Sequence, residues 1–328
     1  MSQVIKVGAA HVAPVLMDAA ASARKAASWI RAAGDDGVRL LVFPEVFLPG
    51  FPYWINCYPP LLQADVNRRY QDQSVELDGP EIRLLRETCA ESKVAVIMGA
   101  SERRTGSRTC FNSAIFIDHH GQVVGVHRKL KPTYAERYIW GEGDGSTLIA
   151  PELVGTRVSA LCCWEHTMNL ARQAVAEQQA RIHAALWPGL STLAGFATVA
   201  NLQIEAMMKN HAITGQCFVV CASSPVTQQM LDWMERELGP QSLTGLGGGW
   251  TALIHPFAAV LAGPVVGVEE RLVTADINVA DVDSVKLWLD GTGHYARPDV
   301  LRLVVDRSSR SSCTFVTEHE SEKDQPGQ

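Results

Sequence analysis

Apolar segments rich in β-forming residues alternate along this chain with segments of helical periodicity. We expect strands at residues 4–10, 40–43, 94–99, 113–117, 123–126, 158–162, 184–187, 218–222, 251–254 and 272–276. We expect helices at residues 17–33, 79–91 and 170–179. A helix and a sheet each have an apolar face that must be covered, and in an alternating chain they cover one another. The alternation therefore predicts an α/β fold in which helices pack on sheet.

The chain has no segment that reads as a linker between domains, and no internal repeat of solenoid type. Of its 328 residues, 47% are hydrophobic and 20% are charged, which is ample for a large core. We therefore expect one domain over residues 1–307. The remaining residues, 308–328, form a polar tail with few apolar side chains to bury, and we expect this tail to be partly disordered.

A strand-like run at residues 158–162 is followed directly by Cys163, Trp164, Glu165 and His166. A residue at the end of a strand lies at the rim of a sheet, where a substrate can reach it. A thiol is also the side chain closest to being a nucleophile at neutral pH. The alternative is that Cys162 or Cys163 is a small buried hydrophobic residue, which is the usual fate of a free cysteine.

Two other expected strands end at polar residues. The run at 39–43 is stopped by Pro44, and Glu45 follows it in apolar surroundings that would raise the pKa of the carboxyl group and suit a general base. A helix-capping role for Glu45 is the alternative. The hairpin-like segment 116–126 leads into a basic cluster at 127–131 that contains Lys129, with Glu136 shortly after it. Alone, such a cluster is typical of a solvated surface.

Taken together, these segments resemble the nitrilase superfamily of carbon–nitrogen hydrolases. Glu45 in Phe-Pro-Glu matches the catalytic base of the family, Lys129 in Arg-Lys-Leu-Lys-Pro-Thr matches its lysine, and Cys163 in Cys-Trp-Glu matches its nucleophile. Glu136 matches the second glutamate that many members carry after the lysine. Any one motif is weak evidence, whereas three in the same order and spacing are strong.

The resemblance covers roughly residues 4–305, and the stretches 140–145 and 293–299 are similar to the nitrilase branch, not to the amidase, carbamoylase or glutaminase branches. One departure is visible at residues 167–170, where many members have a Pro-Leu pair after Cys-Trp-Glu. Because that proline shapes the loop beneath the nucleophile, the shape of the pocket and the identity of the substrate are left open.

The resemblance implies a four-layer α-β-β-α sandwich, and hydrolysis of an organic nitrile to the carboxylic acid and ammonia. Cys163 would form a thioimidate and then a thioester, Glu45 would transfer protons, and Lys129 would stabilise negative charge. We expect arylacetonitriles or aromatic nitriles to be preferred. The alternatives are an aliphatic amidase or carbamoylase with the same residues, a cyanide-hydrolysing enzyme, and a catalytically silent scaffold of this fold.

Four further aromatic residues are candidates for substrate binding: Tyr53, Trp54, Trp164 and Trp187. Plain core packing is the alternative for Trp187. Strand neighbours face opposite ways, so if Cys163 faces the pocket then Cys162 packs in the core. His166 is close to the nucleophile in sequence, but adjacency does not give reach, and we expect a supporting structural role for it.

Composition excludes several classes of partner and cofactor. A net charge of −6 without a basic stripe argues against nucleic acid, and no apolar run approaches the ~20 residues that cross a membrane. We expect a cytoplasmic protein, in which the eight cysteines are free thiols and not disulfides. The absence of a Cys-x-x-Cys pair argues against a metal site. The proposed chemistry needs no cofactor. The resemblance implies a homo-oligomer, in which dimers extend into spirals and the segment 294–297 packs at a subunit contact.

Overall fold

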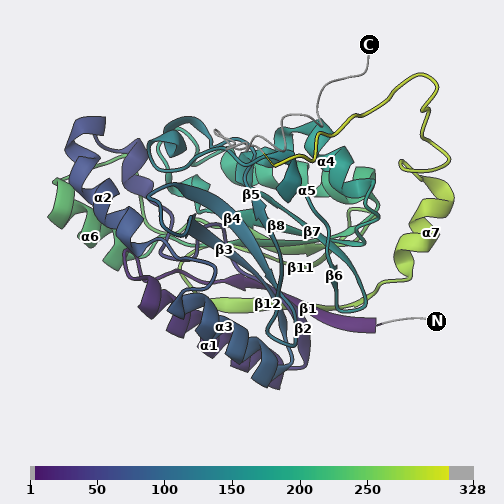
Figure 1. The fold of residues 1–328 in the computed structure, drawn as a ribbon, viewed down its shortest axis with the longest axis horizontal. Helices are drawn as coiled ribbons and strands as arrows, with labels where there is room; N and C mark the ends of the chain where they lie inside the picture. The colour runs from purple at the N-terminus through teal and green to yellow at the C-terminus, as the bar shows by residue number, and fades with distance from the viewer. Residues whose placement is uncertain (1–3, 310–328) are drawn as a thin grey trace, which may run out of the picture.

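The computed structural model describes residues 4–309, and that part of the chain contains two six-stranded sheets (Figure 1). In the first sheet the strands lie in the order β12 (Arg271–Asn278), β1 (Val4–His11), β2 (Val38–Val42), β3 (Ala95–Arg103), β4 (Cys110–Ile117) and β5 (Val123–Arg128). In the second the order is β11 (Val260–Val265), β10 (Thr251–Ile254), β9 (Phe218–Ser223), β8 (Ile182–Trp187), β7 (Thr156–Cys162) and β6 (Glu152–Leu153). Strands β1, β2 and β3 are parallel to one another, as are β7, β8 and β9, and the outer strands pair antiparallel.

Helices cover the outer face of each sheet. In Figure 1, α1 (Ala19–Asp35) and α3 (Pro80–Ser92) lie below the first sheet, and α4 (Asn169–Ala176) and α5 (Ala200–Gly215) lie above the second. At one end, α2 (Ala64–Gln73) and α6 (Gln228–Leu238) lie side by side and are joined by an ion pair between Arg69 and Glu237. At the other end lies α7 (Asp281–Trp288), whose buried Val282 belongs to a core cluster that contains strand residues of both sheets. Helix, sheet, sheet and helix follow in order, which confirms the predicted four-layer sandwich.

Local sequence explains where the covering helices begin. The Asp18 carboxylate accepts a hydrogen bond of 2.8 Å from the Ala21 N–H at the start of α1, and Pro80 occupies the first turn of α3, where a missing N–H costs nothing. Both helices turn small or branched side chains toward the first sheet. This outer core includes Ala23, Ala26, Ile30, Ile82, Leu85, Leu41 and Ile115.

A second core fills the space between the two sheets, and it fixes the direction of the Cys162 side chain. On β7, Val158, Ala160 and Cys162 alternate into this inter-sheet core, where Cys162 is completely buried. The predicted core position of Cys162 is therefore confirmed. The chain then turns sharply into a short 3₁₀ helix, η5 (Cys163–Thr167), which takes Cys163 out of the strand alternation.

The strands and helices expected from the sequence are present, with ends that differ by a few residues. The sequence analysis did not predict α2, α5, α6, α7, β6 or β11, nor the short 3₁₀ helices η1 (Tyr53–Asn56), η2 (Pro60–Gln63), η3 (Tyr134–Tyr138), η4 (Gly145–Thr147) and η6 (Leu190–Thr192). Three of the four residues 294–297 are exposed in the single chain, so they do not pack within it. Their contact with another subunit stays a prediction.

Residues 4–309 contain no helix long and apolar enough to cross a membrane. Seven cysteines lie in this range and all are free thiols, as expected. Nearly all of the polar tail predicted at 308–328 lies outside the described residues, which end at Ser309.

Candidate active site

Three strand ends bring the predicted catalytic residues together. Glu45 follows β2, Lys129 follows β5 directly, and Cys163 follows β7 directly. The Lys129 Nζ lies 2.9 Å from the Glu45 Oε1, and 3.0 and 2.8 Å from the two oxygens of Glu136. The Sγ of Cys163 and a carboxylate oxygen of each glutamate all lie within 4.8 Å of one another. Strands from both sheets therefore contribute to a single cluster.

A close approach between two backbones positions Glu45. The loop that carries it passes over Gly99 of β3 so tightly that a Cβ there would lie 2.0 Å from the Pro44 oxygen and 2.9 Å from the Glu45 Cα. Only glycine allows this contact. The Asn112 side chain, from β4, donates a hydrogen bond of 2.6 Å to the Glu45 Oε1, the same oxygen that accepts from Lys129. Among residues 4–309 the other oxygen, Oε2, has no hydrogen-bond partner.

The second glutamate is fixed by its own helix turn. Glu136 lies in η3, where its Oε2 accepts a hydrogen bond of 2.9 Å from the Thr133 N–H in a capping box. The same carboxylate binds Lys129 through both oxygens. Burial lowers the pKa of Lys129, but the adjacent Glu136 and Glu45 carboxylates outweigh burial and hold this pKa well above its usual value. The ammonium group is therefore permanently charged.

Two carboxylates share this one ammonium group, so one negative charge is left uncompensated, and this affects the pKa of Glu45. Burial raises the pKa of the Glu45 carboxyl group, Lys129 lowers it and Glu136 raises it, which leaves the pKa at about 7. A carboxyl group in that range can both accept and return a proton near neutral pH. The raised pKa expected from the apolar surroundings of Glu45 is thus present, whereas no helix follows for Glu45 to cap.

Cys163 is held in a strained backbone conformation at the turn after β7. Its φ is +53°, in the left-handed region that non-glycine residues seldom occupy. Burial, and then the Glu45 carboxylate, raise the pKa of the thiol well above its usual value, while Lys129 and the backbone N–H of Trp164 lower it. The effect of Lys129 on the thiol pKa is smaller than the combined effect of burial and the Glu45 carboxylate. The resting cysteine is a neutral thiol that needs a base.

Sequence reasoning missed the group that joins the two sheets behind the cluster. The buried Glu165 carboxylate accepts hydrogen bonds from the Leu130 N–H at 2.8 Å and the Cys162 N–H at 3.0 Å, and it pairs with the His127 Nε2 at 2.9 Å. Burial raises the pKa of Glu165, but His127 and these N–H groups more than offset it and hold the pKa below its usual value. Glu165 therefore clamps the residue after Lys129 to the residue before Cys163. The Glu three residues after Cys162, in capping-box position, was the available signal.

Comparison with known proteins places the chain in a family. Residues 6–287 match the model of the carbon–nitrogen hydrolase family. The chain belongs to that family. Similar proteins include an aliphatic nitrilase of Rhodococcus rhodochrous, 37% identical over 91% of this chain and 81% of the relative, and an arylacetone-specific nitrilase of Alcaligenes faecalis, 34% identical over 96% and 88%. A protein called nitrilase 2, from an unknown prokaryotic organism, is 38% identical over 95% of both chains.

Solved structures agree on the fold of this carbon–nitrogen hydrolase. A Saccharomyces cerevisiae member of branch 10 of the nitrilase superfamily has a TM-score of 0.70 at 17% identity, over 89% of this chain and 97% of that chain. A carbon–nitrogen hydrolase of Helicobacter pylori has a TM-score of 0.69 at 16% identity, over 90% and 96%. The family resemblance and the sandwich expected from the sequence are both confirmed.

The four aromatic residues predicted to bind substrate lie at different depths in this hydrolase. The Tyr53 hydroxyl accepts a hydrogen bond of 2.7 Å from the Gly189 N–H, and burial, opposed by that bond, raises the pKa of Tyr53, to which Glu45 and Cys163 also contribute. Trp164 is only partly buried and meets Trp187 edge to face, with ring centroids 6.1 Å apart. Trp54 donates to Asn67 and packs against Tyr70 and Trp233.

All four aromatic residues belong to the apolar cluster that contains Cys163 or pack against it. Tyr53 and Trp164 interact directly with groups of the site, through the electrostatic effect on Tyr53 and the N–H of Trp164. Trp54 has its contacts with α2 and α6 instead. Their roles in substrate binding stay predictions.

The cluster has the composition of a metal site but not its charge balance. Glu45, Glu136 and Cys163 offer two carboxylates and a thiol at ligand spacing. Lys129 already lies within 3.0 Å of both carboxylates, so a bound cation would lie against an ammonium group. The donor set therefore favours proton transfer over metal binding, and the expectation of a metal-free site stays a prediction.

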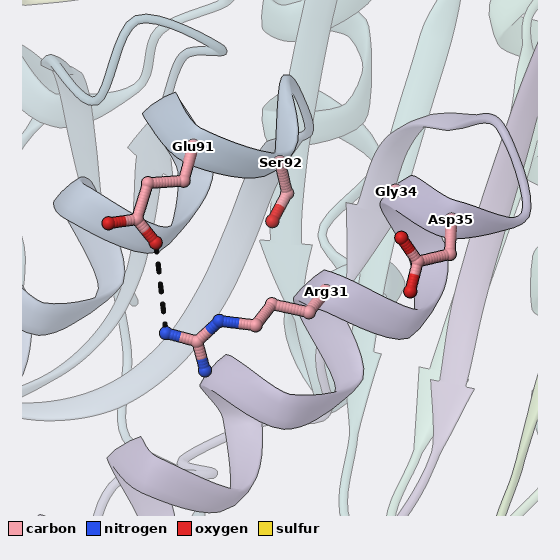
Figure 2. Close-up of a pocket in the computed structure, with 5 residues that line it drawn as sticks. All are labelled: Arg31, Gly34, Asp35, Glu91 and Ser92. Carbon is pink, nitrogen blue, oxygen red and sulfur yellow. Dashed lines mark ion pairs between the residues drawn. The ribbon is translucent and has the colours of Figure 1, made fainter.

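A separate cavity on the surface carries none of this chemistry. Figure 2 shows a hollow of about 340 Å³ at the ends of α1 and α3, lined by Arg31, Gly34, Asp35, Glu91 and Ser92. In it, Arg31 reaches across to Glu91 at 3.8 Å, an exposed ion pair of little energetic weight. The cavity lies in the outer helix layer and not at the strand ends that carry Cys163.

Proposed function

We propose that this protein is a nitrilase, which hydrolyses an organic nitrile to the carboxylic acid and ammonia through covalent intermediates on Cys163. The observation that carries the proposal is the grouping of the Cys163 Sγ with oxygens of Glu45 and Glu136 inside 4.8 Å, with the Lys129 ammonium bound to both carboxylates. A neutral thiol, a carboxylate base and a fixed cation are what covalent attack on a C≡N bond requires. The relatives named as nitrilases support the same reading.

The first half of the reaction forms a bond between sulfur and carbon. Glu45 takes the proton of the Cys163 thiol through Oε2, the oxygen left without a partner. The thiolate attacks the nitrile carbon, one C–N π bond breaks, and Glu45 returns the proton to nitrogen. The product is a neutral thioimidate. The second C–N π bond breaks when water adds: Glu45 accepts one proton of the water and delivers it to the nitrogen, which becomes an amine.

The second half releases both products. Glu45 takes the hydroxyl proton of the tetrahedral intermediate and passes it to the amine. The C=O bond forms as the C–N bond breaks, which releases ammonia and leaves a thioester on Cys163. A second water, activated in the same way, breaks the C–S bond and gives the carboxylic acid and the free thiol. One nitrile and two waters are consumed for each acid and ammonia released, so Glu45 ends in its starting protonation state.

Lys129 and the backbone N–H of Trp164 act on the charge that develops during these steps. The ammonium group, fixed by Glu136 and Glu45, lies where an anionic nitrogen or oxygen would form. The N–H of Trp164 lowers the pKa of the Cys163 thiol, so we assign it as a second donor to the charge that develops. Neither donor has to reorganise as charge develops, which is the condition for strong transition-state stabilisation.

We propose further that aryl-substituted nitriles, arylacetonitriles among them, are preferred. The rings of Trp187 and Phe196 lie against Trp164, the residue that follows the nucleophile, with centroids 6.1 and 6.3 Å from it. Edge-to-face contacts of this kind stabilise a bound aromatic ring by about 0.5–1.5 kcal/mol each. One relative is named as aliphatic and another as arylacetone-specific, so the aryl preference rests on this aromatic wall.

The experiment that tests the proposal measures ammonia released from phenylacetonitrile, mandelonitrile, benzonitrile, an aliphatic dinitrile, cyanide and the matching amides. Wild type and Cys163→Ala are compared, with circular dichroism to verify that both fold. We expect ammonia from the nitriles, fastest from the aryl compounds, and none from the variant. Turnover of amides alone would move the protein to the amidase or carbamoylase class, cyanide alone to the cyanide-hydrolysing class, and activity in Cys163→Ala would overturn the mechanism.

We also propose that the protein is a homo-oligomer. Large apolar side chains are exposed on neighbouring helices of one face, among them Leu170 of α4 and Leu202 of α5, 69% and 67% exposed. A second copy that covers them would bury apolar area at little entropic cost, because both helices are already ordered. Light scattering coupled to gel filtration tests this: a stable, fully active species of 35.7 kDa would refute it.

A further inference from the structure

A chain of buried polar side chains lies behind the nucleophile and takes no part in the mechanism above. The His166 Nδ1 is 2.7 Å from the carbonyl oxygen of Cys163, and its Nε2 is 3.0 Å from the Nε2 of His183. The Nδ1 of His183 is in turn 2.8 Å from the Ser159 hydroxyl. All three side chains are buried, and the ring of His211 stacks on His183 with centroids 3.9 Å apart.

The carbonyl oxygen of Cys163 sets the direction of every hydrogen bond in this series of side chains. A carbonyl oxygen can only accept, so the Nδ1 of His166 must carry a proton. A neutral His166 then has a bare Nε2, which must accept from a protonated Nε2 of His183. The Nδ1 of His183 is therefore bare and accepts from Ser159. Donation thus runs from Ser159 through both rings to the carbonyl of Cys163.

Burial supports the neutral state that this assignment needs. It lowers the pKa of His166 to about 4 and, with the neighbouring His211, holds the pKa of His183 well below its usual value. These side chains are also shielded from water. In the protein interior, hydrogen bonds are electrostatically stronger than in water, and each bond polarises the next.

The hydrogen-bond chain ends on the peptide group between Cys163 and Trp164. The carbonyl of Cys163 and the N–H of Trp164 belong to one peptide unit, so a strong donor to the oxygen makes the N–H a better donor. That N–H lowers the pKa of the Cys163 thiol, and the carbonyl of the same peptide belongs to the residue held at a φ of +53°. Fixing the carbonyl therefore fixes both the strained turn and the direction of the N–H.

We propose that Ser159, His183 and His166 form a directed hydrogen-bond chain that orients and polarises the Cys163–Trp164 peptide, which makes His166 a positioning residue for the reaction at Cys163. The inference rests on the proposed function for its link to nitrile turnover. Its physical content, a better N–H donor at the thiol, is independent of the substrate.

Two substitutions of His166 separate hydrogen bonding from packing. His166 also stacks on Trp187, with centroids 5.4 Å apart and planes 17° apart. His166→Phe keeps the ring and removes the donor, whereas His166→Asn keeps an N–H near the Nδ1 position and removes the ring. We expect His166→Asn to stay within a few-fold of wild type and His166→Phe to lose about tenfold or more in kcat with KM unchanged, because the donor acts on the transition state. The reverse order, or equal losses, would overturn the proposal.

A second set of variants leaves His166 in place. His183→Leu and Ser159→Ala remove the later donors, and a polarised chain predicts losses that shrink with distance from Cys163: His166→Phe largest, His183→Leu smaller, Ser159→Ala smallest. His183→Gln, which can present an N–H near the Nε2 position, should recover much of the loss of His183→Leu. Losses in kcat that follow the buried volume removed, and not the distance from Cys163, would overturn the proposal. The His183 and Ser159 variants remain a test even if His166→Phe fails to fold.

The rate of Cys163 alkylation by iodoacetamide as a function of pH gives a readout that needs no nitrile. The N–H of Trp164 lowers the pKa of the thiol. Weakening it should shift the alkylation profile to higher pH in His166→Phe but not in His166→Asn. If wild type turns over no nitrile while this order of profiles holds, the proposed function fails and the inference stands. If nitriles are hydrolysed and all profiles coincide, the inference fails alone.

Discussion

The clamp formed by Glu165 permits a quantitative test of what holds the two sheets in register at the active site. Its two oxygens accept from three donors: the Leu130 N–H on one oxygen, and the His127 Nε2 and the Cys162 N–H on the other. Burial lowers the pKa of His127, but Glu165 overrides burial and holds it above the usual value, so the pair is ionised. We expect Glu165→Gln to disrupt this arrangement without changing its volume.

The magnitude follows from counting acceptors. A glutamine has one oxygen, so its NH₂ group faces at least one of the two backbone N–H groups and leaves that group without a partner, at about 1–3 kcal/mol. Loss of the buried charge pair with His127 brings the expected decrease in the free energy of unfolding to about 3–5 kcal/mol. Because the donors flank Lys129 and Cys163, kcat should fall together with stability.

Urea unfolding at pH 7 and fixed protein concentration, followed by tryptophan fluorescence, measures the change in unfolding free energy. The matched control is Glu142→Gln, which removes a carboxylate from an exposed ion pair with Lys131, where both side chains are more than half exposed. An exposed pair of this kind contributes about 1 kcal/mol at most. If Glu165→Gln loses no more stability than Glu142→Gln, the clamp does not hold the sheets together.

Three more predictions follow from groups of the site. The kcat/KM of wild type should fall as pH drops through about 7, where the coupled carboxylates around Glu45 take up a proton, and a profile flat from pH 6 to 8 would contradict this. Gly99→Ala should lower kcat by about 100-fold, because a Cβ 2.0 Å from the Pro44 oxygen must displace the base, and displacements near 1 Å cost that much. Gly245→Ala is the control: its added Cβ would lie 3.8 Å from the Thr192 oxygen, an ordinary contact, so kcat should not change. His166 has a folded-state pKa of about 4 against an ordinary 6.5, so it stabilises the fold fully above pH 6.5 and loses this contribution as pH falls toward 4. The loss amounts to about 3 kcal/mol, and urea midpoints of His166→Asn that fall as steeply with acid as those of wild type would refute it.

The grouping of the candidate catalytic residues could be predicted because each directly or closely follows a strand, and strand ends of one direction meet at one edge. Glu45, Lys129 and Cys163 satisfy that rule, and the family motif supplied Glu136. Asn112 and the pair of Glu165 with His127 could not be predicted in the same way. Their partners lie 35–67 positions away in the chain, so the contacts depend on how the sheets are registered and stacked.

The missed elements have physical reasons as well. Helix α5 exposes Leu202 and Ile213 while it buries Ile204 and Met208, so its apolar residues do not fall on one face. Strand β11 contains Pro264 and lies at the edge of its sheet, where a missing N–H is tolerated but β-propensity is low. Helix α6, by contrast, has a clear amphipathic pattern that buries Met230, Leu231 and Met234, and this periodicity is a signal for a helix in the sequence.

The unequal surroundings of the two Glu45 oxygens impose an order on the catalytic cycle. Oε1 is occupied by Asn112 and Lys129, so every proton that Glu45 handles must pass through the single atom Oε2. One oxygen holds one proton at a time. The proton taken from sulfur must therefore be delivered to the substrate nitrogen before any water can be activated. Within this scheme, once the thiol has been deprotonated, Oε2 is free to activate the first water only after the thioimidate has formed, so formation of the C–S bond and hydrolysis of the adduct are separated in time by a single proton.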